Sequence, residues 1–196
     1  MRVLVRVAPA AAAVSLAAIA GAQPAILPAA QQIAAAVLPL PAEFRASATV
    51  LGYGADGTLG TLRAGSGPFN CLASDPKVAR FHVACYHKSL EPFMARGREL
   101  RAQGITGERV DTVRFAEVKS GALKMPAQPA ALYSLTGGTF DAATGTAQGA
   151  RPLYVIYIAG ATAESTGIPA RPAEGTPWVM FPGTPKAHIM FVPRMQ

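Results

Sequence analysis

The fold is decided around residues 48–63, which read ATVLGYGADGTLGTLR. Two runs rich in Thr, Val, Leu and Tyr, 48–53 and 58–63, flank the turn sequence Ala55-Asp56-Gly57. An Asp-Gly pair between such runs favours a β-hairpin, because both turn positions tolerate a positive φ. A second break, Gly65-Ser66-Gly67-Pro68, separates this hairpin from a third predicted strand at 69–72.

Two helices are predicted after these strands. Ser89 can cap a helix that stops at Gly104, and Thr106 can cap another that runs to about Lys119. The first helix carries its inward residues at helical spacing: Leu90, Phe93, Met94, Gly97 and Leu100. In the second, the inward candidates are Val110, Val113 and Val118. Their short connection indicates a helical hairpin.

Strands return beyond residue 126, with candidates at 131–135, 153–158, 178–181 and 189–192. A long Gly- and Pro-rich loop, 160–176, separates the second candidate from the third, and loops of this length in compact domains are functional or mobile. Strands, then helices, then strands indicate an α+β domain. We therefore expect an antiparallel sheet with an inserted helical hairpin and one disulfide, in a single domain over residues 44–196.

Residues 23–43 contain four prolines among Ala, Gln and Leu. Proline removes backbone donors and restricts the residue before it to extended conformations. The stretch is predicted to be a linker or an extended arm, in which residues 31–38 could form a short helix.

Residues 1–22 have the layout of a secretory signal peptide. Arg2 and Arg6 precede an apolar run of roughly 14 residues, and Ala20-Gly21-Ala22 supplies small residues at a cleavage site. The run is shorter than the roughly 20 residues that a membrane-spanning helix needs. We therefore expect cleavage after Ala22, a periplasmic or secreted location, and no transmembrane segment after cleavage.

The chain has two cysteines, Cys71 and Cys85. In an exported protein an oxidised pair is the default expectation. A catalytic dithiol usually has closer spacing, such as C-x-x-C, so this pair is predicted to be a structural disulfide.

Several catalytic motifs can be tested against the sequence. Ser74-Asp75-Pro76-Lys77 has the S-x-x-K spacing of penicillin-recognising enzymes, but a proline lies inside the motif and the Ser-Asp-Asn element of those enzymes is missing. The sequence has no G-x-S-x-G elbow, and no lysine-bearing helix follows Gly65-Ser66-Gly67 to hold phosphates. These motifs therefore predict no enzyme class.

The three histidines are His82, His87 and His188, and His188 is followed by Met190 in a predicted strand. Imidazole and thioether groups can bind a metal ion or haem, so His188 and Met190 are candidate ligands. His82 and His87 are five residues apart, which matches neither a helical nor a strand pair on one face. No C-x-x-C-H haem motif is present, and structural roles are favoured for all three.

The predicted helical hairpin is basic. Residues 77–124 contain ten Lys or Arg and five Asp or Glu, and Arg96, Arg98 and Arg101 lie close together on one helix. These arginines could form a surface for an acidic partner, such as an anionic envelope component or a protein, although a solvated helix face is the commoner arrangement. Nucleic acid is disfavoured, because export removes the usual target and no aromatic residues alternate with the arginines.

Two short motifs resemble those of an uncharacterised family of exported bacterial proteins. One is the run 61–71, TLRAGSGPFNC, followed by a second Cys, and the other is 187–193, AHIMFVP. The family has an Arg-x-Gly-x-x-Gly-x-x-Cys turn, and many members read Thr-Asn-Gly where this chain has Ser66-Gly67-Pro68. The resemblance implies no activity. It implies that a set of residues converges where the disulfide meets the last strand: Arg63, Gly65, Cys71, Cys85, His188 and Met190.

The sequence favours an exported protein that binds or associates with the envelope without catalysing a reaction and without a cofactor. Two alternatives stay open. One is a periplasmic enzyme with a site around His188 and the Gly65 turn, in which His188 and Arg63 are candidate catalytic residues. The other is a metal- or haem-binding protein. An enzyme needs His188 in an open cleft, and a metal protein needs a second ligand beside it.

Overall fold

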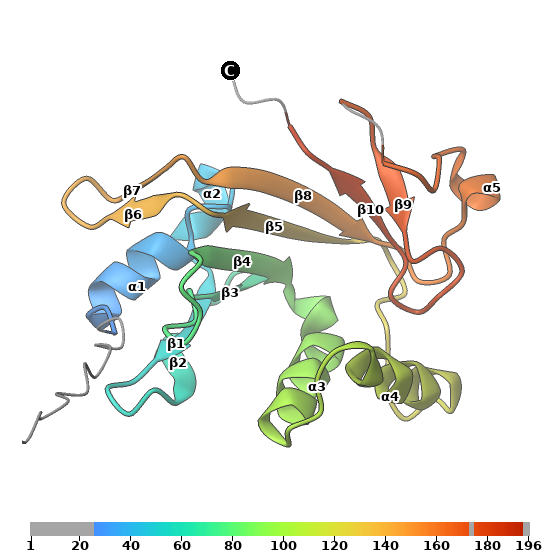
Figure 1. Cartoon of the computed structure of the whole chain (residues 1–196), viewed down its shortest axis with the longest axis horizontal. Coiled ribbons are helices and arrows are strands. Elements are labelled where there is room, and N and C mark those ends of the chain that lie inside the picture. The colour runs from blue at the N-terminus through green and yellow to red at the C-terminus, as the bar shows by residue number, and fades with distance from the viewer. Residues whose placement is uncertain (1–25, 173–174, 194–196) are drawn as a thin grey trace, which may run out of the picture.

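The structure is a computed structural model that describes residues 26–172 and 175–193. The predicted signal peptide, residues 1–22, lies outside the described residues. An eight-stranded sheet forms the centre of the domain, in the order β2-β1-β3-β4-β5-β8-β10-β9 (Figure 1). Neighbouring strands are antiparallel except β1 and β3, which are parallel. The strands are β1 (Thr49–Tyr53), β2 (Leu59–Arg63), β3 (Phe69–Leu72), β4 (His82–His87), β5 (Ala130–Thr136), β8 (Arg151–Tyr157), β9 (Trp178–Met180) and β10 (His188–Phe191).

The N-terminal hairpin forms as predicted, with β1 paired to β2. Asp56 stabilises its turn by accepting a hydrogen bond from the Thr58 amide, at 3.0 Å, and Gly57 has a φ of 75°. A β-branched residue at position 57 would be strained in this conformation.

The chain then crosses from β2 to the other side of β1, and the predicted break at 65–68 makes this crossing possible. A Cβ atom added at Gly65 would collide with the main chain of Ser47 and Ala48, and one added at Gly67 would collide with Ser47. The Gly67 amide donates to the Ser47 carbonyl at 2.8 Å. Glycine is required here because two backbone segments approach each other closely.

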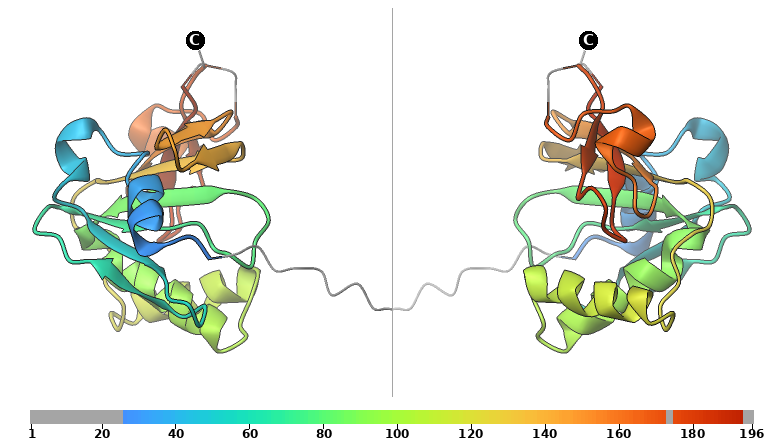
Figure 2. Two further views of the ribbon diagram at one scale, coloured as in Figure 1. Left: turned by 90° about the vertical axis from the view of Figure 1, so that its left-hand side faces the viewer. Right: turned by 90° about the vertical axis from the view of Figure 1, so that its right-hand side faces the viewer.

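Two N-terminal helices, α1 (Ala29–Ala36) and α2 (Ala42–Arg45), cover one face of the sheet around β1 and β3. In the left view of Figure 2, α1 lies in front of the strands. This differs from the linker predicted for residues 23–43, since Ala36 and Leu40 are almost fully buried. The prolines that suggested a linker begin the helices instead, with Pro28 and Pro41 at the N-cap positions. Proline is tolerated at a helix start, where its missing N–H would have no partner.

The predicted helical hairpin is confirmed. A 3₁₀ turn, η1 (Lys88–Leu90), leads into α3 (Glu91–Ala102), and α4 (Glu108–Lys119) follows (Figure 1). Leu90, Phe93 and Leu100 are buried, and Gly104 ends the first helix with a φ of 81°. Leu90 and Met94 pack with the opposite face of the sheet, against Tyr86, Val155 and Tyr157.

Other elements were not expected from the sequence. β4 had no clear strand pattern, and a small second sheet forms from β6 (Thr139–Asp141) and β7 (Thr146–Gln148). Within the predicted long loop, Thr162 and Ser165 form a capping box that starts a single-turn helix, α5 (Ala163–Thr166). These local turns order a segment that composition alone presents as irregular.

The predicted disulfide is present between Cys71 and Cys85. The two residues lie directly opposite each other on β3 and β4, with Cα atoms 3.9 Å apart, and both are fully buried. Together with the mixed helices and mostly antiparallel sheet, the disulfide confirms the predicted fold class. No helix in the described part of the chain is long and apolar enough to span a bilayer.

Candidate functional site

A cavity of about 430 Å³ lies at the end of the sheet that α1 covers. Its walls come from α1 and the two residues at the start of the described chain, the end of β1, the β3–β4 loop and the start of β6 (Figure 1). The lining residues are Ile26, Leu27, Gln32, Ala35, Tyr53, Ala73, Ser74, Asp75, Pro76, Val78, Ala79, Phe81 and Thr139. The volume and the mostly apolar lining are those of a small-molecule site.

Gln32 fixes α1 over this end of the sheet. Its side-chain amide donates to the carbonyls of Leu27 and Tyr53, at 2.7 and 2.8 Å, and accepts from the Tyr53 amide at 2.8 Å. The side chain mimics a strand partner for the end of β1, which leaves its polar atoms satisfied although the residue is buried. The wall formed by α1 is therefore attached to the sheet by directional bonds as well as by packing.

A polar group lies in the lining where β1 meets the β3–β4 loop. Asp75 begins an Asx turn, accepting the Lys77 amide at 2.8 Å through its side chain and the Val78 amide at 3.1 Å through its carbonyl. Tyr53 and Asp75 both line the cavity here, and the phenol lies near the Asp75 carboxylate. Burial and the neighbouring carboxylate raise the pKa of Tyr53 to about 12, so the phenol stays protonated.

The rim of the cavity carries apolar side chains that are exposed to solvent. Leu27 is 41% exposed and Val78 is 53% exposed, and the two lie on segments far apart in the sequence. Exposed apolar groups beside an apolar cavity gain free energy when a ligand covers them. This arrangement fits a site that binds an apolar molecule.

His188 does not lie in this cavity. It is 5% exposed, its Nδ1 is 2.7 Å from the Lys186 carbonyl oxygen, and its ring packs on Tyr157 and Phe181. Since a carbonyl can only accept, Nδ1 carries the hydrogen. Burial holds the pKa of His188 below its ordinary value, so the neutral ring persists. This buried ring, bonded to the main chain, has the surroundings of a packing residue rather than those of a general base in an open cleft.

Met190 lies on the same strand and packs into the apolar cluster around Val155 and Tyr157. Among the residues that the structure describes, no three His, Cys, Asp or Glu side chains gather closely enough to hold a metal ion. Both side chains pack against neighbours in the sheet, His188 on Tyr157 and Met190 on the cluster around Val155.

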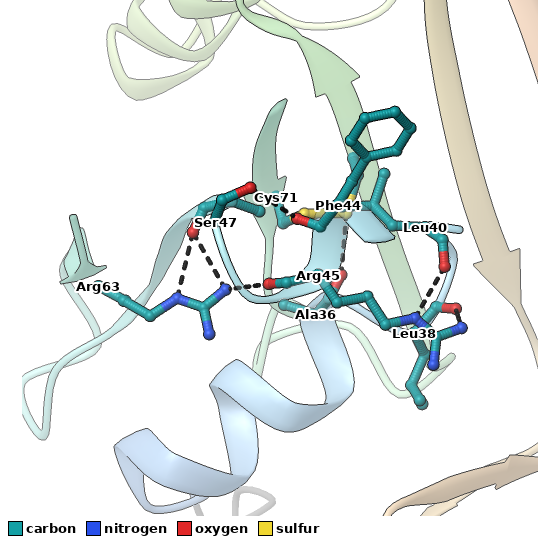
Figure 3. Close-up of a disulfide and its surroundings, with 10 residues drawn as sticks. Ala36, Leu38, Leu40, Phe44, Arg45, Ser47, Arg63 and Cys71 are labelled. Atoms are coloured by element: carbon teal, nitrogen blue, oxygen red, sulfur yellow. Dashed lines mark hydrogen bonds between the residues drawn. A yellow bond between two sulfur atoms is a disulfide. The ribbon is translucent and has the colours of Figure 1, made fainter. Parts of the chain in front are cut away.

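Arg63 forms hydrogen bonds near the point where the chain crosses from β2 to the other side of β1, as Figure 3 shows. Its guanidinium donates to the carbonyls of Ala48 and Arg45, with distances from 2.6 to 3.1 Å. Arg45 in turn donates to the carbonyls of Leu38 and Leu40. These two arginines satisfy main-chain oxygens where α2 and the Gly65 turn meet, which is a structural role.

The residues that the family resemblance predicts to converge lie in two separate parts of the sheet. Arg63, Gly65 and the disulfide lie around β1, β3 and β4, whereas His188 and Met190 are on β10, with β5 and β8 in between. The disulfide packs beneath α1, and Met190 belongs to the cluster on the opposite face. A shared site of His188 and the Gly65 turn is therefore not formed.

The three arginines of the predicted anionic-partner surface have partners within the hairpin. Arg96 pairs with Glu117 at 2.7 Å and with Glu99 at 3.2 Å. Arg98 pairs with Glu91 at 2.6 Å and also bonds to the Tyr86 hydroxyl. Arg101 donates to the Gly97 carbonyl at 3.0 Å. Two of the three arginines, Arg96 and Arg98, are thus paired with carboxylates, while the excess of basic over acidic residues in 77–124 stays as the sequence has it.

The other two histidines have local partners as well. His82 bonds through Nδ1 to the Thr136 hydroxyl at 2.8 Å, on the neighbouring strand. His87 accepts the Ser89 amide at 3.2 Å and so caps the turn that leads into α3. Both rings thus hydrogen-bond to residues of the sheet or of the turn before α3.

The sequence does not predict the cavity, because its walls come from four separate stretches of the chain: residues 26–35, 53, 73–81 and 139. In the sequence, Asp75 stands out only as part of the S-x-x-K spacing, which predicts no site here. The Asp-Pro pair signals a turn, and a turn can place a carboxylate at the end of a sheet, but no periodicity marks the residues that face it.

No family model, curated protein or solved structure matches the chain.

Proposed function

We propose that this protein is an exported, non-enzymatic binding protein that holds a small apolar molecule in the cavity beneath α1. The observation that carries the proposal is an apolar cavity of about 430 Å³ whose rim exposes Leu27 and Val78. A ligand entering the cavity would remove these side chains from water and add dispersion contacts inside.

Export is part of this proposal. It rests on the signal-peptide pattern of residues 1–22 and is supported by the buried Cys71–Cys85 disulfide, since disulfides persist in oxidising compartments. An envelope association remains compatible with the proposal, because a carrier of apolar molecules would work next to membranes.

A cavity-filling variant tests the binding site. Ala79 lines the cavity and is exposed, so Ala79→Trp should place an indole in the mouth without disturbing the core. Binding of the neutral fluorescent probe N-phenylnaphthylamine, measured by titration, should weaken at least about tenfold in this variant, since the ring and the probe cannot share the space.

The matched control is Ala102→Trp, which adds the same ring at an exposed position on α3, away from the cavity. It should bind the probe like the wild type. The proposal is wrong if the wild type does not bind, or if the two variants weaken binding equally.

A further inference from the structure

The charged side chain of Asp75 restricts the class of ligand that the cavity can bind, a restriction that rests on the proposed binding function. Among the described residues that line the cavity, Asp75 alone carries a charge. Lys77 and Arg80, on the same loop, are exposed to solvent and are not part of the lining. A ligand in the cavity therefore meets one negative charge in a lining that is otherwise uncharged and mostly apolar.

The hydrogen bonds already made by Asp75 leave part of its capacity free. One carboxylate oxygen accepts the Lys77 amide at 2.8 Å, and the Tyr53 phenol lies near the same side chain. A carboxylate offers about four acceptor positions, so at least one remains for a donor from a ligand. The nearby Gln32 amide oxygen already accepts the Tyr53 amide and carries no charge, so it is the weaker acceptor for a cationic donor.

The negative charge of Asp75 determines whether the polar group of a bound ligand is cationic or anionic. A cationic amine would gain a charge-assisted hydrogen bond to Asp75, whereas a carboxylate of the same size would face a like charge close by. Water is partly excluded from the cavity, which strengthens both the attraction and the repulsion relative to the open surface.

We propose that the ligand is an apolar molecule with a protonated amine at one end, which binds Asp75 while its apolar body fills the space between α1 and the β3–β4 loop. The Asx turn, in which the Asp75 side chain accepts the Lys77 amide, positions the carboxylate for this contact. Leu27 and Val78 then cover the apolar body at the rim.

Three ligands of equal chain length test the proposal: octylamine, octanol and octanoate, each titrated into the wild-type protein by calorimetry at pH 7. Octylamine should bind at least about tenfold more tightly than octanoate, with octanol between them, because one charge-assisted bond is worth about that factor. Asp75→Asn keeps the Asx turn, since its amide oxygen can accept the Lys77 N–H, but it removes the charge. It should abolish the preference for the amine.

The control is Asp141→Asn, which removes an acidic group from an exposed turn of the same kind outside the cavity lining. This variant should keep the preference. Equal binding of the three ligands, or tighter binding of octanoate, overturns the amine inference and leaves the binding function intact. Binding of none of the three overturns the proposed function as well.

Discussion

The three histidines of the chain have similar sequence contexts, each next to apolar residues in or near a strand, yet their surroundings differ. His87 caps a turn, His82 bonds to a neighbouring strand, and His188 is enclosed by Tyr157 and Phe181. The sequence favours structural roles for all three, but it does not show which ring is buried. Burial lowers the pKa of His188, and burial together with the nearby Arg80 lowers that of His82.

His188 predicts a loss of stability in mild acid. In the unfolded chain a histidine titrates near its ordinary pKa of about 6.5. Burial places the pKa of folded His188 lower, so between the two pKa values the unfolded chain binds more protons. Stability must then decrease as the pH falls below about 6.5. Urea unfolding at several pH values between 7 and 5 measures the slope.

His188→Gln serves as the comparison, because the amide can still donate to the Lys186 carbonyl but does not titrate. Its stability should change less over the same pH range, whatever its stability at pH 7. Identical slopes for the two proteins would show that His188 contributes nothing to the acid sensitivity.

At the scale of the elements, α4 shows where periodicity misleads. Val110 is buried as predicted, but the other fully enclosed residue of the helix is Arg114. Its guanidinium lies 3.8 Å from the centre of the Phe93 ring and donates to the Phe93 carbonyl at 3.1 Å. Gly97 leaves room for it, since a Cβ there would lie 2.9 Å from Nη1. Patterns that treat arginine as a surface residue cannot predict such a contact.

Asp111 balances the buried charge of Arg114 and also binds Lys186, at 2.8 Å, which joins α4 to the segment before β10. Asp111→Ala should destabilise the protein by about 3 kcal/mol, because it leaves a buried cation without its carboxylate. Chemical denaturation measures this loss.

Lys186→Met is the matched variant, as it removes the more exposed partner and keeps the Asp111–Arg114 pair. This variant should lower the free energy of unfolding by about 1 kcal/mol or less, since a partly exposed ion pair contributes little. Equal costs for the two variants would mean that Arg114 does not depend on Asp111.

For the whole molecule, the prediction concerns export and the disulfide together. Protein produced with its own N-terminus in a bacterial host should begin at Gln23 and contain no free thiol. Intact-mass measurement after alkylation under denaturing conditions tests both points at once. A mass that retains residues 1–22 contradicts the signal peptide, and two alkylated cysteines contradict oxidation in that compartment. Protein reduced before alkylation supplies the control, since it must gain two adducts.

The N-terminal helices show how the whole fold changes the meaning of a segment. Residues 23–43 look like a linker by composition, yet α1 covers the disulfide, and the Ala36 carbonyl lies 3.1 Å from the Cys85 sulfur (Figure 3). An Ala-rich helix of eight residues is unstable alone, so only packing against the sheet makes it form. The cavity exists because this helix is docked there.

The sequence by itself determined the hairpin, the helical hairpin, the cysteine pair and the α+β class, because turns, helix periods and cysteine usage are local or compositional signals. Only the tertiary structure decided that α1 packs on the sheet, that β1 and β3 are parallel, that Arg96 and Arg98 pair with carboxylates, and that Tyr53 and Asp75 meet in a cavity. These features join segments that are distant in the chain. Their free energy comes from burial and pairing across many contacts at once, which no single stretch of sequence contains.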